Sequence, residues 1–534
     1  MSHQEAHQAC LEGPLWRESK PGSSIFTRLC HGQEASASFN QNVCDGHTEL
    51  SMCLTFRYDG SGEDLVLRSK EAWRQIRRWH PESGIELSTG TEEEQTMTFV
   101  DFASRGTEGA IEEDQWLKET WEVIEAGNDP RIATWIDVAT LTYRRKLPTA
   151  GKRSKMYLVL APRQPSKPAS PTDTVDDLDV QDHCFIWNVS HAVTDGFSFN
   201  NFFNTFLELV AGDKATSNAV NTVAIAERLP GTVLSAYVMK YQPKEADRRL
   251  SNEAAAEQTR LYQARMHESV VLRPRPDQAY RRHLTTCLLN RLSAIVSEKV
   301  ILSLKRLAVP ISVTYIGAAS LILSIRRLFG TGVETGALLG LTRNARRWVH
   351  TDGAIRSGEE SNALDAPIPM ATDVVYLWVP FEGLELANPS SPVTAEHLVA
   401  LSYRIRSALE PHLSSPHYIS QHHLMAVAFI RALQSSQGPS REPEFGPQAP
   451  GFSPGGAWSI REHFPASQGS NGILQRKFLY QTGRQVSPSP WISMYAVSGR
   501  ICFHLGFDEK YWTREDMKDL LRSTSDGVAS IAAL

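Results

Sequence analysis

The pattern of hydrophobic residues along the chain predicts both helices and strands. The first clear stretch has the spacing of a helix. Within residues 65–81, Ala72, Ile76 and Trp79 fall at i, i+4 and i+7, which places them on one face of a helix. Pro81 cannot continue a helix, so we expect the element to end just before it.

Continuous apolar runs predict strands that are covered on both faces. Residues 156–162 and 183–190 are two such runs. Directly after the second run, residues 199–210 carry phenylalanine, leucine and valine at helical spacing, and Gly212 follows as a helix cap. The order of strand, short polar loop and amphipathic helix predicts that residues 191–198 form a loop held rigidly at both ends.

The second half of the chain contains a further set of strands and helices, which predicts a second core. In chain order we expect a strand at 285–289, helices at 297–308 and 309–325, strands that begin at 336 and 372, two strands around a turn at Ser498-Gly499, and a helix at 514–521. Two stretches rich in proline, glycine and serine, 163–179 and 435–456, are typical of loose surface segments.

These elements predict an α/β protein of two lobes, each with a mixed sheet flanked by helices. We expect an N-terminal lobe at 1–214, a polar crossover segment at 215–280 and a C-terminal lobe at 281–534.

Composition narrows the class of protein only slightly. The 534 residues are 41% hydrophobic and 22% charged, with a formal net charge of -5, as in an ordinary globular protein. This balance favours neither a nucleic-acid partner nor a membrane partner, and the apolar run at 309–325 contains too many polar residues for a membrane span. The polar start and the absence of any CxxC pair among seven cysteines lead us to expect a cytoplasmic monomer with reduced thiols.

The chemistry that the sequence offers is concentrated in the loop "NVSHAVTDGFSF" at 188–199. His191 is suited to act as a general base because its ordinary pKa lies near neutrality. Asp195 follows four residues later and could orient the loop, and Gly196 suits a backbone with positive φ or one that passes close to another group. A histidine and an aspartate at this spacing also occur by chance, so a purely structural histidine remains an alternative.

"SHAVTDGFSF" resembles the HxxxDG motif of the chloramphenicol-acetyltransferase-like superfamily, which includes the BAHD acyltransferases and the peptide-synthetase condensation domains. "EAWRQIRRWHPESGIELS", "VPISVTYIGAASLIL" and "GLTRNARR" resemble further segments of that superfamily in the same order. Among its members the chain is most similar to fungal secondary-metabolite acetyltransferases, such as the trichothecene 15-O-acetyltransferases of mycotoxin biosynthesis.

The resemblance implies a solvent channel between two lobes, in which His191 deprotonates an alcohol that attacks the thioester of acyl-CoA. Acetyl-CoA would then be the co-substrate and a small-molecule alcohol the acceptor, with no permanently bound cofactor. Asp195 would play a structural role by pairing with an arginine, for which Arg343 is the candidate. The DFGWG segment of BAHD enzymes is absent, and "GFSPGGAW" stands in its place, so Ser453 and Gly455 are the candidates for oxyanion or substrate binding.

Four other interpretations remain open. "GFSPG" fits the GxSxG pattern of serine hydrolases through Ser453, although no buried strand is expected before it. A condensation-type domain that takes its acyl group from a carrier protein and a non-catalytic binding module are compatible with the same fold. His412, His417, His422 and His423 could bind zinc, but no cysteine or carboxylate motif accompanies them, so we expect no metal site.

Overall fold

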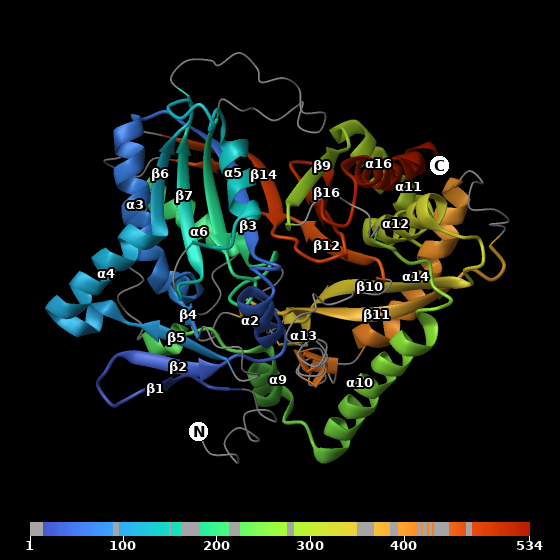
Figure 1. Ribbon diagram of the computed structural model, residues 1–534, viewed down its shortest axis with the longest axis horizontal. Helices are drawn as coiled ribbons and strands as arrows, with labels where there is room; N and C mark the ends of the chain where they lie inside the picture. The colour runs from blue at the N-terminus through green and yellow to red at the C-terminus, as the bar shows by residue number, and fades with distance from the viewer. Residues whose placement is uncertain are drawn as a thin grey trace.

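The computed structural model is an α/β protein built on two large sheets and one small sheet, which confirms the expected fold class (Figure 1). The described residues are 14–88, 95–148, 151–162, 182–212, 225–274, 282–349, 368–384, 393–414, 418–419, 424–426, 430–431, 448–465 and 473–534. The expected loose segment 163–179 lies outside this set.

The first large sheet has six strands in the order β13-β14-β3-β8-β7-β6. All neighbours are antiparallel except β6 and β7, which run parallel. Its strands are β3 (Leu50–Tyr58), β6 (Trp121–Glu125), β7 (Ser154–Leu160), β8 (His183–Val189), β13 (His463–Phe464) and β14 (Leu474–Gly483). The predicted strands at 156–162 and 183–190 are thus β7 and β8, which pair side by side.

Four helices occur between the strands of this sheet in chain order. Their apolar residues pack with those of the strands in two hydrophobic cores. They are α3 (Gly62–Trp79), α4 (Gly106–Thr120), α5 (Trp135–Arg144) and α6 (Phe199–Ala211). α3 is the helix predicted at 65–81, and its apolar stripe of Ala72 and Ile76 is buried. α6 ends at Gly212, whose left-handed φ of 82° confirms it as the cap.

A small sheet and a short helix complete the N-terminal part of the fold, and the sequence pattern did not reveal them. The small sheet has the order β1-β2-β5-β4. These elements are β1 (Arg17–Glu18), β2 (Ile25–Leu29), β4 (Glu86–Leu87), β5 (Thr96–Val100) and helix α2 (Gln33–Val43).

The second large sheet has six strands in the order β11-β10-β12-β15-β16-β9. β12 lies in its interior and runs parallel to both neighbours, whereas the other pairs are antiparallel. Its strands are β9 (Thr285–Arg291), β10 (Gly336–Asn344), β11 (Thr372–Pro380), β12 (Gly451–Ala457), β15 (Trp491–Val497) and β16 (Arg500–Asp508). The turn between β15 and β16 contains Ser498 and Gly499, both with positive φ, as predicted.

One face of this second sheet carries a large apolar core covered by helices. The helices that carry this core are α11 (Ala294–Arg306), α12 (Val313–Phe329), α14 (Ala395–Ser414) and α16 (Arg514–Ser530). α12 is the long apolar segment of the sequence, and its residues 316–326 are all buried. No helix in the described part of the chain is long and apolar enough to cross a membrane.

The described part of the crossover segment is largely helical, and its long helix at residues 245–265 runs along the edge of the second sheet, beside β11 (Figure 1). It contains α8 (Ile225–Arg228), α9 (Val233–Tyr241) and α10 (Glu245–Arg265). Gln258 of α10 accepts a hydrogen bond from the backbone N–H of Tyr376 on the edge strand β11, at 2.9 Å. The helix therefore satisfies part of a sheet edge that would otherwise be open to other strands.

Strand pairing departs from the expected lobe division at one place. Residues 463–464 and 474–483 were expected in the C-terminal lobe, yet β13 and β14 extend the first sheet beside β3. The chain crosses from the second sheet into the first after β12 and returns before β15. The lobe boundary expected at residue 281 therefore does not separate the two sheets.

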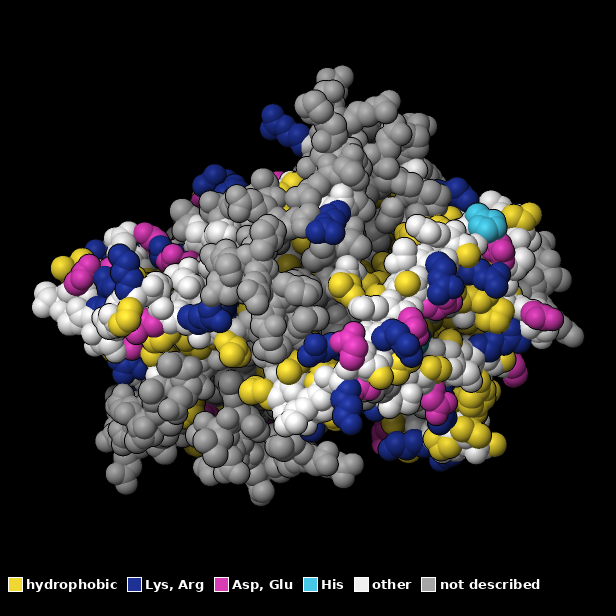
Figure 2. Space-filling view, turned by 90° about the horizontal axis from the view of Figure 1, so that it is seen from below, with side chains coloured by type: hydrophobic (Ala, Val, Ile, Leu, Met, Phe, Trp, Pro, Cys, Tyr) yellow, Lys and Arg dark blue, Asp and Glu magenta, His cyan; other side chains and the backbone are white. Residues whose placement is uncertain are grey.

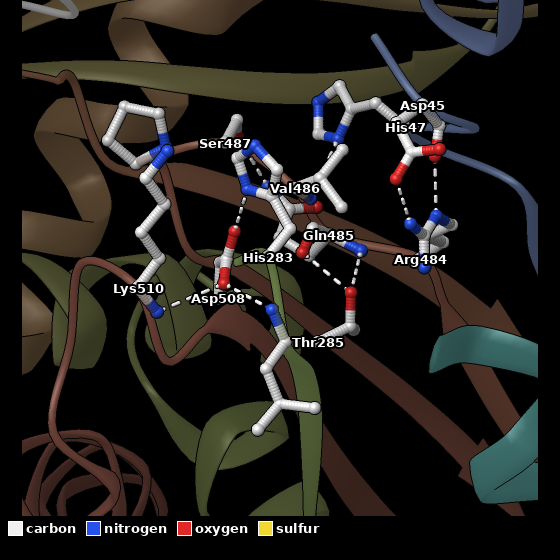
Figure 3. A network of polar contacts seen from close by, with 12 residues as sticks. Asp45, His47, His283, Thr285, Arg484, Gln485, Val486, Ser487, Asp508 and Lys510 are labelled. Carbon is white, nitrogen blue, oxygen red and sulfur yellow. Dashed lines mark hydrogen bonds and ion pairs between the residues drawn. The ribbon is translucent and has the colours of Figure 1, made fainter. Parts of the chain in front are cut away.

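The return crossing at residues 484–487 is bound by groups from both lobes (Figure 3). Arg484 donates to Asp45, in the loop that precedes β3. One residue later, Gln485 and Thr285 of β9 exchange two hydrogen bonds at 2.7 and 3.0 Å. Asp508, at the end of β16, is fully buried and accepts from His283 at 2.5 Å. The crossing is thus fixed to both sheets.

Side chains of both charges are mixed on the lower face of the molecule. Figure 2 shows basic and acidic side chains interspersed with apolar ones over the described part of the lower face.

Candidate active site

The loop with the HxxxDG motif lies where the sequence predicted it, between β8 and α6. Ser190 donates its backbone N–H to the carbonyl of Arg153 at 2.8 Å, and Ala192 and Val193 are buried. On the two flanking elements, the rings of Trp187 and Phe202 stack with centroids 3.6 Å apart. The loop therefore leaves one rigid element and enters another, as an active-site loop requires.

His191 is the only partly exposed residue of the segment 189–195, all of which is otherwise buried. Its Nδ1 atom is buried, with the backbone of His191 and Thr194 beside the ring, so Nε2 is the ring nitrogen that is left to meet a substrate. Burial lowers the pKa of His191 below its ordinary value of 6.5, and the Asp195 carboxylate and the backbone at His191 and Thr194 partly oppose this shift. The imidazole is therefore neutral at neutral pH.

Asp195 is fully buried and points away from any solvent. Its Oδ2 accepts from the backbone N–H of Ala371 and the hydroxyl of Thr372, each at 2.8 Å, and from Nη1 of Arg346 at 3.0 Å. Its Oδ1 accepts from the backbone N–H groups of Phe197 and Ser198. Burial alone would raise the pKa of Asp195, but Arg346 and these hydrogen bonds outweigh it and lower the pKa.

The arginine that pairs with Asp195 is Arg346, so the expectation of Arg343 was wrong. Arg346 starts the short helix α13 (Arg346–Val349), where the chain turns after β10. Its guanidinium donates to Asp195, to the hydroxyl of Ser198 at 2.7 Å and to the carbonyl of Ile368 at 2.8 Å. It thus connects the motif loop of the first lobe to the start of β11 in the second.

Arg343 lies on β10, where neighbouring side chains point to opposite faces of the sheet. It stands directly opposite Asp373 on β11 and binds that carboxylate through Nε at 2.8 and 2.9 Å. Its Nη1 also donates to the carbonyl of His412 at 2.5 Å. Arg343 therefore ties β10 and β11 to α14, and the two arginines have different partners.

Gly196 does not have the backbone conformation that was expected. Its φ is not among the positive values of the described chain. A Cβ atom at this position would lie 3.4 Å from Nε2 of Gln481, which is ordinary van der Waals contact. The backbone at Gly196 therefore does approach another group, as expected, but only to an ordinary contact distance.

Ser453 and Gly455 lie on β12, in a region that the sequence predicted to be loose. The strand is placed by its pairing with β10 and β15, and Pro454 is tolerated at a bulge in that pairing. Ser453 accepts a hydrogen bond from Thr342 at 3.1 Å. Gly455 faces Tyr495, whose Cβ would be 3.1 Å from a Cβ at this position.

This geometry excludes the serine hydrolase interpretation. A nucleophile elbow needs a strand immediately before the serine and a helix immediately after it. Ser453 instead lies inside a strand that continues to Ala457.

Of the four histidines considered for zinc, only His412 belongs to the described residues.

Sequence reasoning missed the other residues that bind Asp195. Thr372 and Ala371 are supplied by the start of β11, and the backbone N–H of Ser198 by the end of the motif loop itself. Only Arg346 left a usable signal, because it belongs to the arginine-rich segment "GLTRNARR" from which Arg343 was chosen.

Solved structures with similar architecture identify the fold. The model superposes on the TRI3 trichothecene 15-O-acetyltransferase from Fusarium sporotrichioides with a TM-score of 0.75 and 14% identity, covering 97% of this chain and 98% of that one. It also superposes on the condensation domain of the monacolin K polyketide synthase MokA with a TM-score of 0.54 and 13% identity, covering 94% and 97%. The fold is therefore that of the chloramphenicol-acetyltransferase-like and condensation-domain superfamily, as the motif resemblance implied.

Two curated relatives give the family. The chain is 34% identical to the acyl-CoA-dependent acyltransferase MAC1 of Pseudozyma antarctica, over 98% of this chain and 96% of the relative. It is 36% identical to the acyl-CoA-dependent acyltransferase MAC1 of Mycosarcoma maydis, over 98% and 89%. The chain belongs to this family of fungal acyl-CoA-dependent acyltransferases, and acyl-CoA is its co-substrate. No family model matches the sequence.

Proposed function

We propose that the protein transfers an acyl group from acyl-CoA directly to the hydroxyl of a small-molecule alcohol, with His191 as the general base. The observation that carries this proposal is the state of His191: a neutral, partly exposed imidazole on a loop fixed at both ends. Bringing both substrates to one base removes much of the entropic part of the barrier.

In the proposed step, Nε2 of His191 takes the proton of the alcohol while the alcohol oxygen bonds to the thioester carbonyl carbon. The tetrahedral intermediate collapses, the C–S bond breaks, and the imidazolium returns the proton to the thiolate of CoA. No acyl-enzyme forms, and the imidazole ends the cycle neutral. General-base catalysis of this kind contributes about 10²–10⁴ in rate.

Ser453 is our proposal for the group that stabilises the oxyanion of that intermediate. Because its Oγ accepts from the hydroxyl of Thr342, its own O–H is free to donate to another oxygen. Such a donor strengthens its bond as charge develops on the carbonyl oxygen.

We take an acetyl group and a hydrophobic secondary metabolite as the first donor and acceptor to test. The fold similarity to a trichothecene 15-O-acetyltransferase supports this choice. Because the chain length of the acyl group is open, the donors should run from acetyl-CoA to long-chain acyl-CoA, with carrier-protein thioesters as a separate set.

The decisive experiment measures thiol release and product mass for wild type and His191→Ala. We expect the variant to lose about 10²–10⁴ in kcat/KM while it keeps its thermal unfolding midpoint. His463→Ala is the control, because His463 is exposed on β13 at the end of the first sheet.

The pH profile adds a second criterion. Since the pKa of His191 is lowered, the base stays neutral down to below pH 6.5, and the acid limb of kcat/KM should lie below that pH. A His191→Ala variant with near wild-type turnover would contradict the proposal.

A further inference from the structure

Helix α11 exposes large hydrophobic residues in the middle of its solvent-facing side. Its inward side is formed by four buried residues, Ser297, Val300, Ser303 and Leu304. On the opposite side, Ile295 is 67% exposed and Leu302 is 41% exposed. These two residues are seven positions apart, so in a helix they lie within about 20° of each other. Two aliphatic side chains therefore share the centre of the outward side.

Basic side chains stand on both flanks of this apolar centre. Lys299 and Arg306 lie on one flank and Lys305 on the other, and all three are exposed. None of the three forms an ion pair with another residue in the described part of the chain. The helix dipole favours basic residues in the last turn, which accounts for Lys305 and Arg306 but not for Lys299. Three positive charges thus remain for a partner outside the chain.

Exposed apolar residues also adjoin the end of the helix. Val309, which follows α11 directly, is 49% exposed. The short helix η4 (Ile531–Ala533) packs against α11 and leads to Leu534, which is 50% exposed. In Figure 1, α11 lies beside α16 in the helical layer of the second lobe, apart from the motif loop between β8 and α6. This surface is therefore separate from the candidate active site.

We propose that the outer face of α11, formed by Ile295, Lys299, Leu302, Lys305 and Arg306, binds the surface of an anionic lipid bilayer. An interfacial helix buries its aliphatic side chains at the boundary between headgroups and acyl chains. The long stems of lysine and arginine let their charges reach the lipid phosphates from the same helix.

The combination of side chains favours a bilayer over other partners. Protein interfaces are depleted of lysine, whereas this face carries two lysines beside its apolar centre. The phosphate backbone of a nucleic acid would attract the basic residues but offers no apolar partner to Ile295 and Leu302. Only an anionic bilayer matches both kinds of side chain.

The net charge of -5 does not oppose this binding, because charges act over only about 8 Å at physiological salt. The composition of the whole chain gave no sign of a membrane partner because the unpaired positive charge is confined to one helix. Each basic residue beside an anionic leaflet strengthens binding about fivefold, so three of them supply about 100-fold. The binding is reversible and weakens as salt is added.

The test is co-sedimentation of the full-length protein with lipid vesicles. One set contains phosphatidylcholine with about a third phosphatidylserine, and the other contains phosphatidylcholine alone. We expect the wild type to bind the mixed vesicles and to remain in solution with the neutral ones. Lys299→Gln/Lys305→Gln/Arg306→Gln should weaken binding about 100-fold. Ile295→Ser/Leu302→Ser should weaken it at least about tenfold.

The matched control neutralises three exposed arginines that pair with nearby carboxylates, Arg131, Arg249 and Arg260. Arg131→Gln/Arg249→Gln/Arg260→Gln changes the net charge by the same amount and should bind vesicles as the wild type does. All substituted side chains are exposed, so each variant should keep its thermal unfolding midpoint.

Three results would overturn the proposal: wild type that binds neither set of vesicles, equal binding to both sets, or an equal loss in the control. His191→Ala should bind the mixed vesicles as the wild type does, because the outer face of α11 acts independently of catalysis.

Discussion

At the scale of single residues, the first lobe contains a buried acid outside the candidate site. Glu49 is 1% exposed and accepts from the backbone of Leu147 and the side chain of Gln41, each at 2.7 Å. Burial raises its pKa from 4.5 to about 7, although those hydrogen bonds and the charge of Arg484 oppose the shift. The folded state therefore holds a proton that the unfolded chain has lost above pH 5.

This residue makes the stability of the protein fall as the pH rises from about 5 to 8. The raised pKa corresponds to about 3 kcal/mol, present in full below the unfolded pKa and lost above the folded one. Glu49→Gln should stabilise the protein at pH 8 and flatten this dependence, because a neutral amide removes the buried charge. Its oxygen can accept from the backbone of Leu147, and its NH2 group can donate to the side-chain oxygen of Gln41 once that amide is turned over. Urea unfolding at pH 5 and at pH 8 measures the unfolding free energy of wild type and variant. If the stability of Glu49→Gln depended on pH as strongly as that of the wild type, the assignment to Glu49 would be contradicted.

Single residues also mark the limit of what the sequence could predict at the site. His191 and Asp195 could be chosen because they share one short loop between two recognisable elements. The partner of Asp195 could not, because the choice between Arg343 and Arg346 depends on where β10 ends. Because side chains alternate along a strand, Arg343 shares the helix-covered face of β10 with Leu339 and Leu341, and this orientation could not be assigned before the strand was placed.

At the scale of elements, the contact between the motif loop and the start of β11 is the main polar contact between the two lobes near the site. Asp195 meets Arg346, Ala371 and Thr372 there, and all these residues are on the C-terminal side of the crossover segment. Removing the charge of Asp195 leaves a guanidinium that is 12% exposed without its carboxylate. Breaking such a buried pair costs about 3–5 kcal/mol.

Asp195→Asn should therefore lower both the unfolding free energy and kcat. A double-mutant cycle of Asp195→Asn with Arg346→Gln should give a coupling energy above about 1 kcal/mol. The same cycle with Arg343→Gln is the control and should give additive effects, because Arg343 binds Asp373 instead. Strong coupling to Arg343 and none to Arg346 would contradict the pairing.

Some helices and strands could be predicted from their own residues, and others could not. α3, α6, α12 and the strands β7, β8, β15 and β16 have strong apolar periods or runs, and they were predicted close to their observed positions. β12 reads "GFSPGGA", which has little strand propensity, and exists because two flanking strands pair with it. Gly451 is needed there, since a Cβ would lie 2.5 Å from the ring of Trp491. A strand that is determined by its neighbours in this way has no periodic pattern of hydrophobic residues in its own sequence.

At the scale of the whole molecule, the two lobes share strands and cannot be separated at the crossover segment. β14 pairs along its whole length with β3, from Leu474 beside Tyr58 to Gly483 beside Leu50. A chain of residues 1–280 lacks this partner and leaves the apolar strand β3 at an open edge.

We expect residues 1–280 expressed alone to be insoluble or unfolded, and co-expression with residues 281–534 to restore a soluble, folded complex. Circular dichroism and size-exclusion chromatography of both preparations measure this. A folded, monomeric 1–280 fragment would show that β14 is dispensable for the first sheet.

The pairing of β14 with β3 also sets an order of events during synthesis. About 420 residues separate the two strands, so the ribosome must release most of the polypeptide before the edge of β3 can be closed. Throughout that interval the nascent chain exposes an apolar strand of the kind that chaperones bind. Co-translational delay near the 3′ end of the message would lengthen this exposure, whereas a delay near the 5′ end would not.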